Sequence, residues 1–438
     1  MNRGAQNTLS DIARRTLLFV LPALTLVVGV GLRQLAAGHE RPLRPELIVA
    51  LLTAAVGPLV AMLVLNSVDP GFDSVLVAAA AMLTAIGVAT LHSLSLVQGA
   101  DSAFYRVIAV RHAFFVGAGF LAMIAGAILS HRLDEIRRYP FTLFGVALAL
   151  TATTIVFGET VNGARLWLRI GPVQFQPSEV ARLLLAGFIA VYLYDRRHLI
   201  AAPWRLGSID LPPAPYLLPL VGAVLAAVAV LVFQNDLGMA ALGVLGAYAS
   251  IASVLRAKSS IGPAGGILIL AAVASYAMAP RVRDRIVGWL EPWHDPVGRG
   301  FQFVQADYAL AAGGLFGESS PIVPARVPEV HTDFILVGVA SQWGLAGVVA
   351  VLALLCVIVC RCVSAALNAG NGLRSLLAMA MATLIGVQVL LISGGTLRVL
   401  PLTGLTVPLV SFGGTSLVVT LFALGIMAGL RTSGVSES

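Results

Sequence analysis

Charged residues are scarce in this chain. Asp, Glu, Lys and Arg together make up 11% of its 438 residues, whereas roughly a quarter of an ordinary soluble domain is charged. Hydrophobic residues account for 58%. A soluble fold is not compatible with so few charges and so much apolar surface, and the composition therefore indicates an integral membrane protein.

Cysteine is scarce as well. Cys356, Cys360 and Cys362 are the only three, and they cluster at the end of one apolar segment. This arrangement excludes a disulfide framework, and we infer no redox or metal chemistry from it. The net charge of +7 comes largely from arginines in short loops beside apolar segments. Membrane topology accounts for these arginines, and no nucleic-acid partner is expected.

Long apolar segments are abundant. A helix needs roughly 20 apolar residues to cross about 30 Å of hydrocarbon. Each such segment is predicted to be a helix, because the hydrocarbon offers no water to satisfy backbone groups. We therefore predict an all-α integral membrane protein with about twelve transmembrane helices. The predicted spans are 16–36, 47–67, 74–96, 112–130, 142–157, 178–194, 215–233, 237–254, 264–280, 334–360, 375–396 and 407–430.

The basic residues in short loops predict the orientation. Loops 131–140 and 195–213 carry three arginines each, and Arg256 with Lys258 follows the eighth span. Basic loops face the cytoplasm, which places both termini there too. The first span follows two arginines but has no clear cleavage site after it, so it is predicted to be a retained helix and not a signal peptide.

The long outward loop 281–333, between the ninth and tenth spans, is the main candidate for chemistry. It has about 50 residues, whereas the other links have around 20 or fewer, and long ordered loops are often functional. Asp295 lies between a histidine and a proline in a glycine-flanked turn, where its carboxylate can accept a proton from a sugar hydroxyl. The alternative is that Asp295 merely caps the turn.

His331 and Asp333 precede the tenth span within the same loop. Asp333 can simply N-cap that helix, and His331 can bond nearby backbone. His294, Asp295, His331 and Asp333 are suitable metal ligands by type, but their spacing matches no recognised site, and no metal site is predicted.

A polar segment opens the sixth span. Ser178 is predicted to be its N-cap, with an acid in the first turn. Glu179 and Arg182 lie three residues apart on one helical face and can form an ion pair, which lowers the cost of placing either charge in the membrane. Two further polar interruptions, 234–238 and 401–416, are explained equally well by turns.

Taken together and in order, these motifs resemble the SEDS family of shape, elongation, division and sporulation proteins, the group that contains RodA and FtsW. The similarity covers about residues 75 to 430. It includes a histidine-threonine-aspartate-phenylalanine entry to the tenth span and a serine-aromatic-glycine-glycine signature near the last one. The segments that carry it are 162–165, 176–182, 234–238, 295–305, 328–334, 400–408 and 411–416.

Several positions depart from the family pattern. Asn235 replaces a proline, Thr415 a serine and Ile392 a frequent asparagine, while Gln342 stands where many members have glutamate. None of these departures removes the loop aspartate or the Glu179 pair. Activity is therefore expected to be retained.

The resemblance implies a core of ten helices over 74–430, preceded by a two-helix extension over 1–73 and followed by a cytoplasmic tail over 431–438. It implies polymerisation of lipid II outside the cytoplasmic (inner) membrane, beside membrane lipid and with a class B penicillin-binding protein as partner. Asp295 is the implied base. Arg165 and Arg182, with Mg²⁺ or Mn²⁺, are the implied pyrophosphate ligands. The remaining implied substrate contacts are Gln176, Glu179, Gln305, His331, Asp333 and Ser411.

Two other functions remain open from the sequence. A lipid flippase or transporter would use the same polar interruptions, often within an inverted repeat, and no convincing repeat is present. A non-catalytic scaffold for a transpeptidase would make Asp295 a turn residue. Transport predicts charges at mid-membrane depth, whereas catalysis predicts charges gathered at the outward face.

Overall fold

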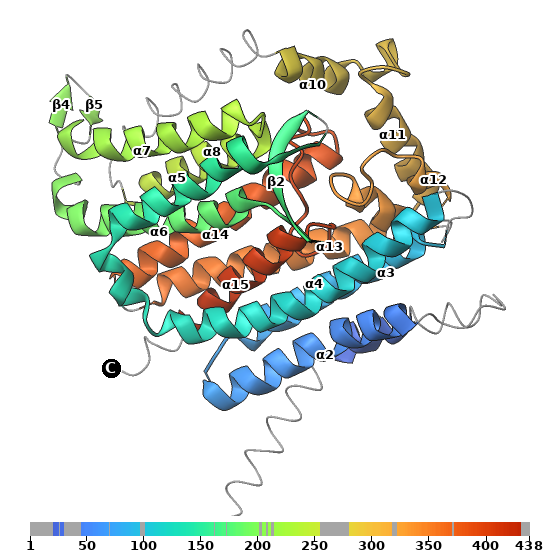
Figure 1. The fold of residues 1–438 in the computed structure, drawn as a ribbon, viewed down its shortest axis with the longest axis horizontal. Coiled ribbons are helices and arrows are strands. Elements are labelled where there is room, and N and C mark those ends of the chain that lie inside the picture. Colours follow the sequence, from blue (N-terminus) through green and yellow to red (C-terminus); the bar gives the residue numbers. More distant parts are fainter. Residues whose placement is uncertain are drawn as a thin grey trace, which may run out of the picture. The chain divides into compact units, whose positions relative to one another are not determined.

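The computed structural model describes most of the chain, and the described part is mainly helical (Figure 1). Predicted span 264–280 and most of span 16–36 lie outside the described residues. The described residues are 21–25, 27–29, 45–69, 71–96, 101–161, 163–171, 173–200, 204–206, 209–211, 214–254, 280–317, 322–369 and 372–430.

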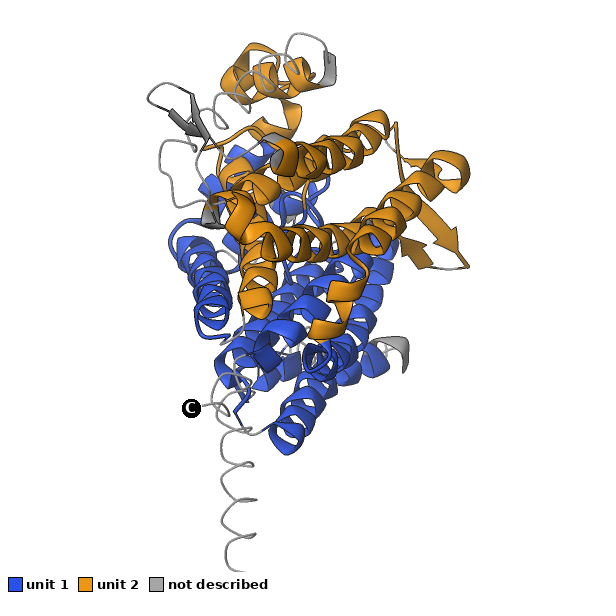
Figure 2. Cartoon of the chain, turned by 90° about the vertical axis from the view of Figure 1, so that its left-hand side faces the viewer, with its two compact units in different colours: residues 1–132, 305–369, 406–438 blue, residues 133–304, 370–405 orange. Residues whose placement is uncertain are grey.

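The chain divides into two compact units, coloured separately in Figure 2. Unit 1 comprises residues 1–132, 305–369 and 406–438, and unit 2 comprises 133–304 and 370–405. Each unit is therefore assembled from segments that are far apart in the sequence. The two units are described separately below.

The described part of unit 1 contains five long helices. They are α2 (Pro45–Val68), α3 (Ser74–Leu94), α4 (Asp101–Ser130), α13 (Ile335–Leu367) and α15 (Gly414–Leu430), together with the short α12 (Ile322–Ala325). Helix α11 (Phe301–Gly313) begins in unit 2 and continues into unit 1.

Glycines let the helices of unit 1 approach closely. A Cβ on Gly425 of α15 would lie 2.0 Å from the carbonyl oxygen of Met123 in α4, and one on Gly126 of α4 would lie 2.2 Å from that of Phe422. Such close backbone contact replaces the hydrophobic effect as a source of attraction between helices in lipid. The α4–α15 pair forms the centre of this unit (Figure 1).

Helix α13 is kinked at Gly344. This residue has φ 63° and ψ −161°, which only glycine adopts readily. A Cβ there would lie 2.2 Å from the backbone of Leu315, and the Leu345 N–H donates to the Gly314 carbonyl at 2.9 Å. At the kink, backbone N–H groups of α13 therefore donate to carbonyls of the turn that follows α11.

The described part of unit 2 contains five long helices and two small sheets. The helices are α5 (Pro140–Phe157), α6 (Pro177–Ile200), α7 (Ala214–Phe233) and α8 (Leu237–Val254), joined by α14 (Gly372–Thr396) from later in the chain. The shorter elements are η1 (Leu133–Arg138), α10 (Pro280–Leu290), η3 (Pro292–His294), β1 (Glu159–Val161), β2 (Ala164–Ile170), β3 (Val173–Phe175), β4 (Trp204–Leu206) and β5 (Ile209–Leu211). Phe188, Tyr192 and Leu193 of α6 lie in its apolar core, with Leu220 of α7.

The fold class predicted from the sequence is confirmed. Seven described helices are long and apolar enough to cross a membrane, and three shorter apolar helices accompany them. These ten correspond to ten of the twelve predicted spans, so the described residues do not decide the total. The last helix begins at Gly414, seven residues later than predicted, because residues 407–413 form turns.

The antiparallel sheet β1–β2–β3 was not predicted. It lies in the link between α5 and α6, with Glu159 opposite Trp167 and Leu168 opposite Phe175. Its strands have three, seven and three residues. Strands this short, without regular alternation, leave little periodic signal in a sequence.

A buried ion pair joins α3 to α13. The Asp73 carboxylate accepts from the N–H of Leu76, capping α3, and lies 2.6 Å from Nη2 of Arg361. The Asp73 side chain is 2% exposed and that of Arg361 is 26% exposed. Loss of the arginine would leave a buried carboxylate without its cation.

We predict that Arg361→Ala destabilises the protein by about 2–4 kcal/mol, since breaking a buried pair strands the remaining charge. Arg374→Ala is the control, because its partner Asp134 is 47% exposed, and exposed pairs contribute at most about 1 kcal/mol. Thermal melting in detergent measures both variants. Equal losses would show that burial of Asp73 does not determine the effect.

Candidate active site

A buried polar cluster occupies the start of α6 in unit 2. Arg182 Nη2 lies 2.8 Å from Oε2 of Glu179, and Arg182 Nη1 donates to Oε1 of Gln388 on α14 at 2.7 Å. The Glu179 and Arg182 side chains are 5% and 9% exposed. The predicted ion pair is thus present, and Gln388, which the sequence did not single out, completes it.

The helix start differs from the prediction. Helix α6 begins at Pro177, which suits the first helical position because proline lacks an N–H. Ser178 therefore lies inside the first turn, and the prediction that it is the N-cap was wrong. Its hydroxyl accepts from the side-chain amide of Gln176 at 3.1 Å. The Gln176 carbonyl also accepts from the N–H of Glu179 at 3.2 Å, so the two residues are neighbours.

Asp236 is a second buried acid close to this cluster. It precedes α8, and its Oδ1 accepts from the N–H of Met239 at 3.1 Å. Oδ2 has no hydrogen-bond partner among the described residues. Burial raises the pKa of Asp236 to about 7, and the negative charge of Glu179 raises it further. The hydrogen bond from Met239 and the positive charge of Arg285 lower it and so offset part of this shift. Asp236 is therefore partly protonated at pH 7 and fully protonated in more acidic solution.

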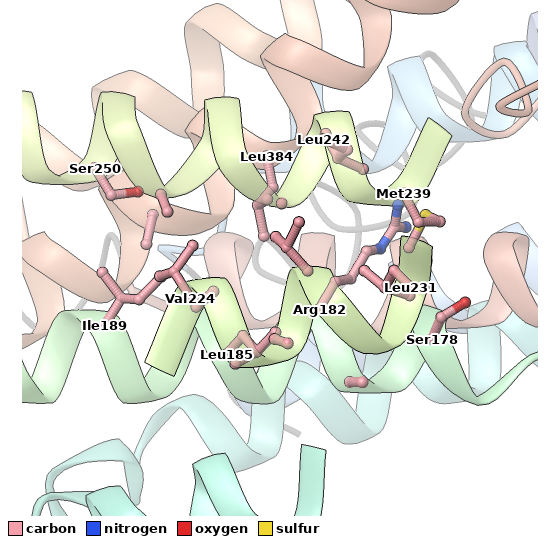
Figure 3. Close-up of a pocket in the computed structure, with 17 residues that line it drawn as sticks. Ser178, Arg182, Leu185, Ile189, Val224, Leu231, Met239, Leu242, Ser250 and Leu384 are labelled. Carbon is pink, nitrogen blue, oxygen red and sulfur yellow. The ribbon is translucent and has the colours of Figure 1, made fainter. Parts of the chain in front are cut away.

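An apolar pocket extends from the polar cluster between α6, α7, α8 and α14 (Figure 3). The space in it that no atom fills is about 590 Å³, and this figure includes space that is open to the outside. Arg182 lies toward one end and Ser250 toward the other, with Leu185, Val224 and Leu384 between them. The pocket thus offers an almost wholly apolar path that ends at a guanidinium group.

Asp295 lies in the turn between η3 and α11. Its carboxylate accepts from the N–H groups of Gly298 at 2.9 Å and Arg299 at 3.0 Å. These bonds, the one from Arg299 first, lower the pKa of Asp295 below its usual value. The side chain is 47% exposed. Asp295 therefore caps its turn and also presents an ionised carboxylate with free lone pairs at the surface of unit 2.

The other predicted site residues of the long loop, Gln305, His331 and Asp333, belong to unit 1. The His331 ring packs edge-on against Phe104 at 5.3 Å between centroids and lies 6.1 Å from Phe412. Burial lowers the pKa of His331, and the nearby Glu329 carboxylate opposes this. His331 is therefore neutral at pH 7. The turn that contains it leads into α13 and is hydrogen-bonded to the segment before α15.

Ser411 makes that tie. Its hydroxyl donates to the Thr332 carbonyl at 2.6 Å and accepts from the Val407 N–H at 2.9 Å, while the Phe412 N–H donates to the His331 carbonyl at 2.8 Å. Asp333 is half-buried in the same turn, but Phe334 and not Asp333 occupies the N-cap of α13. Ser411 and His331 are thus neighbours within unit 1.

The two remaining predicted site residues lie elsewhere. Arg165 is exposed on β2, where its Nε donates to the Thr160 hydroxyl at 3.1 Å. Gln305 is half-buried on α11, at the first residue of unit 1. The predicted set therefore falls into a unit 2 group, containing Glu179 and Asp295, and a unit 1 group, containing His331.

Two departures from the family pattern have structural explanations. Asn235 adopts φ 62°, which asparagine tolerates and proline cannot, and its amide donates to the Gly163 carbonyl at 3.4 Å. Gln342 is buried on α13 and its amide donates to the Thr90 carbonyl on α3 at 3.2 Å. An ionised glutamate could not make that bond. Nothing in the structure explains Thr415 or Ile392.

Comparison with known proteins identifies the family. The family model of FtsW, RodA and SpoVE, described as a cell cycle protein, matches residues 73–434. The chain belongs to the SEDS family. Membership agrees with the order of the motifs described above and with the polytopic helical fold.

Individual SEDS relatives cover most of the chain. RodA of Mycobacterium tuberculosis, a peptidoglycan glycosyltransferase by name, is 31% identical over 84% of this chain and 80% of its own length. A probable peptidoglycan glycosyltransferase FtsW of Geobacter metallireducens is 32% identical over 82% of this chain and 95% of its own. A solved chain from a peptidoglycan synthase complex matches 82% of this chain and 97% of its own, with a TM-score of 0.65 and 31% identity.

Sequence reasoning missed Asp236 and Gln388 as site residues. Asp236 had a signal, because it lies in the polar interruption 234–238 between two apolar spans, but a turn explained that interruption equally well. Gln388 is 206 positions from Arg182, and a single amide in an apolar helix gives no indication of its partner.

We predict that Asp236→Asn raises the melting temperature relative to the parent protein increasingly between pH 5 and pH 8. The folded protein retains the Asp236 proton up to about pH 7, whereas the unfolded chain releases it near pH 4. Stability of the parent therefore falls as pH rises through this window, and the variant avoids that loss. Asp295→Asn is the control, because its lowered pKa places its titration below the window. A pH-independent difference for Asp236→Asn would contradict the raised pKa.

Proposed function

We propose that this protein is a peptidoglycan glycosyltransferase that polymerises lipid II, the undecaprenyl-pyrophosphate-linked disaccharide-pentapeptide, into glycan strands. The observation that carries the proposal is the occurrence, in one compact unit, of an exposed ionised carboxylate at Asp295 and a buried Glu179–Arg182 pair at the end of an apolar pocket. The names of the SEDS relatives support the same activity.

The reaction needs a base and a stabilised leaving group. An acceptor sugar hydroxyl forms a bond to the anomeric carbon of the donor, the bond from that carbon to the phosphate oxygen breaks, and the electron pair leaves with the lipid pyrophosphate. Asp295 takes the hydroxyl proton. Its turn, closed by two backbone N–H groups, holds the carboxylate in a fixed direction before substrate arrives.

Arg182 is the candidate ligand for the pyrophosphate, because a guanidinium group binds phosphate oxygens in a bidentate manner. Glu179 and Gln388 hold that guanidinium from two sides. Arg165 is a second candidate from the sheet surface. The apolar pocket beyond Arg182 is suited to part of a polyprenyl chain, which needs a path lined by hydrocarbon.

A divalent cation, Mg²⁺ or Mn²⁺, is part of the proposal. Among the described residues, no group of three or more His, Cys, Asp or Glu side chains is placed to hold a metal ion. Such a cation would therefore arrive mainly on the pyrophosphate oxygens, where it neutralises charge on the leaving group. The protein's own contribution remains the Arg182 guanidinium.

The proposed setting is the outer face of the cytoplasmic membrane, with both termini in the cytoplasm, as the basic loops predict. A class B penicillin-binding protein, a transpeptidase, is the proposed partner. A solved relative lies in a complex that coordinates polymerisation and crosslinking, which supports a partner of this kind.

A transporter fits the structure less well. The buried Asp, Glu and Arg side chains among the described residues lie near helix ends: Glu179 and Arg182 in the first two turns of α6, Asp236 before α8, and Asp73 before α3. Two buried histidines, His92 and His112, lie within α3 and α4. Transport across the membrane calls for ionisable groups near mid-depth. A scaffold would need neither the buried pair nor the ionised loop carboxylate.

We predict that purified protein polymerises lipid II and that Asp295→Asn lowers the rate about 10²-fold or more, because general base catalysis contributes about 10²–10⁴-fold. Glycan products are resolved on a gel, with the transpeptidase partner present. Asp307→Asn, which alters another loop carboxylate, is the control. Equal rates for Asp295→Asn and the parent would remove Asp295 as the base, and inactivity of the parent with verified lipid II and partner would favour the flippase or scaffold.

Removal of divalent cations by EDTA is expected to lower the polymerisation rate at least tenfold, since charge on the departing pyrophosphate would then be neutralised by arginine alone. Excess MgCl₂ or MnCl₂ should restore the rate. A rate that does not change on EDTA treatment would show that Arg182 suffices and would remove the cation from the proposal.

A further inference from the structure

Helix α10 leads to the turn that contains Asp295, and two of its side chains contact a second segment of the chain. It is joined through η3 to the turn that contains Asp295, and we refer to residues 280–300 as the Asp295 arm. Its partner is the stretch after α14, residues 397–404, which we refer to as the α14 loop. Both belong to unit 2.

The Asp295 arm is internally fixed. Arg299 Nη1 donates to Oδ1 of Asp284 on α10 at 3.2 Å, and the Gly300 N–H donates to the Asp295 carbonyl at 3.0 Å. A Cβ on Gly288 would lie 2.5 Å from the Arg299 carbonyl oxygen. The turn therefore packs directly on α10, and any displacement of α10 moves Asp295 with it.

Three hydrogen bonds dock the arm on the α14 loop. The Trp289 indole Nε1–H donates to the Arg398 carbonyl at 2.9 Å, and Arg398 Nη2 donates back to the Trp289 carbonyl at 3.4 Å. Arg285 Nη1 donates to the Thr403 carbonyl at 3.1 Å. The docking thus depends on two side chains of α10 that recognise backbone carbonyls.

The α14 loop is itself held in one conformation. Arg398 adopts φ 58°, an unusual value for a residue with a side chain, and the Val399 N–H donates to the Gly394 carbonyl at 2.8 Å. A Cβ on Gly238, at the start of α8, would lie 2.5 Å from the Thr403 carbonyl oxygen. The α14 loop therefore lies against Gly238 at the start of α8, two residues after Asp236.

We propose that Trp289 and Arg285 are positioning residues: by docking the Asp295 arm on the α14 loop, they fix the Asp295 carboxylate relative to the Glu179–Arg182 pair. This inference rests on the proposed glycosyl transfer. Neither residue touches the substrate. Their effect arises because a base displaced by about 1 Å loses roughly 10²-fold in rate.

Trp289→Phe is the sharpest test, because it removes one N–H donor and keeps an aromatic ring of similar bulk. The control is Trp167→Phe on β2, the same chemical change in the same unit and away from the arm. Steady-state polymerisation gives kcat and KM, and hydrogen exchange read by mass spectrometry reports opening of residues 280–300 and 397–404.

For Trp289→Phe we expect kcat to fall about tenfold or more, KM to change less than about twofold, and exchange in both segments to accelerate together. Melting temperature should match that of Trp167→Phe, whose kcat and exchange stay at parent values. Arg285→Ala should repeat the pattern, and Arg285→Lys should recover most of kcat, because an ammonium group can still donate to the Thr403 carbonyl.

Three results would overturn the proposal. The first is a parent-like kcat in Trp289→Phe. The second is a lowered kcat with unchanged exchange, which would assign Trp289 some other role, and the third is a lowered Arg285→Ala rate that Arg285→Lys does not recover. A parent protein without polymerase activity would instead refute the proposed function, and exchange would still show whether the docking exists.

Discussion

Inside hydrocarbon there is no water to solvate a charge, so the buried ionised side chains Asp73, Glu179 and Arg182 are each accompanied by a partner. This constraint explains the best-defined feature of unit 2. Arg182 meets a carboxylate on its own helix and an amide from α14, and both bonds are 2.8 Å or shorter. It also explains unit 1, where Asp73 meets both a helix N-terminus and Arg361. These buried charges therefore lie near helix ends, and the apolar stretches between the ends are stabilised by packing against neighbouring helices.

The same constraint separates two kinds of carboxylate in unit 2. Asp236 is buried without a full set of partners, and its raised pKa of about 7 leaves it partly protonated at neutral pH, whereas Asp295 is exposed and bonded to two N–H groups, so it is ionised. Asp295 is therefore ionised throughout the neutral range, whereas Asp236 is only partly ionised at pH 7. Asp236 can contribute a neutral hydrogen bond beside Glu179 without adding a second negative charge. The two residues are both aspartates, so the difference in their protonation arises from their surroundings.

The sequence was a good guide to features that are local. The apolar runs located ten helices, although α4 begins at Asp101 and not at the predicted residue 112. The three-residue spacing of Glu179 and Arg182 predicted their ion pair. Features that depend on distant contacts were not predictable: Gln388 reaches Arg182 from a helix 206 positions later. Ser178 was misplaced because the proline before it can begin a helix as well as interrupt one. The sheet β1–β2–β3 has strands too short to show a period, and the left-handed backbone of Asn235, at φ 62°, is one that a proline at that position could not adopt.

The lowered pKa of Asp295 bears on what kind of base it can be. A carboxylate held by Gly298 and Arg299 is a weak base, and a weak base cannot abstract a proton from an intact sugar hydroxyl at a useful rate. In glycosyl transfer, however, the bond to the leaving group stretches first and the anomeric centre becomes cation-like. The incoming hydroxyl grows acidic as it bonds to that centre, so proton transfer comes late and a weak base is sufficient. Stabilisation of the negative charge on the departing pyrophosphate is then the larger requirement, because that charge develops early. The Arg182 guanidinium, held from two sides by Glu179 and Gln388, therefore matters at least as much as the loop aspartate.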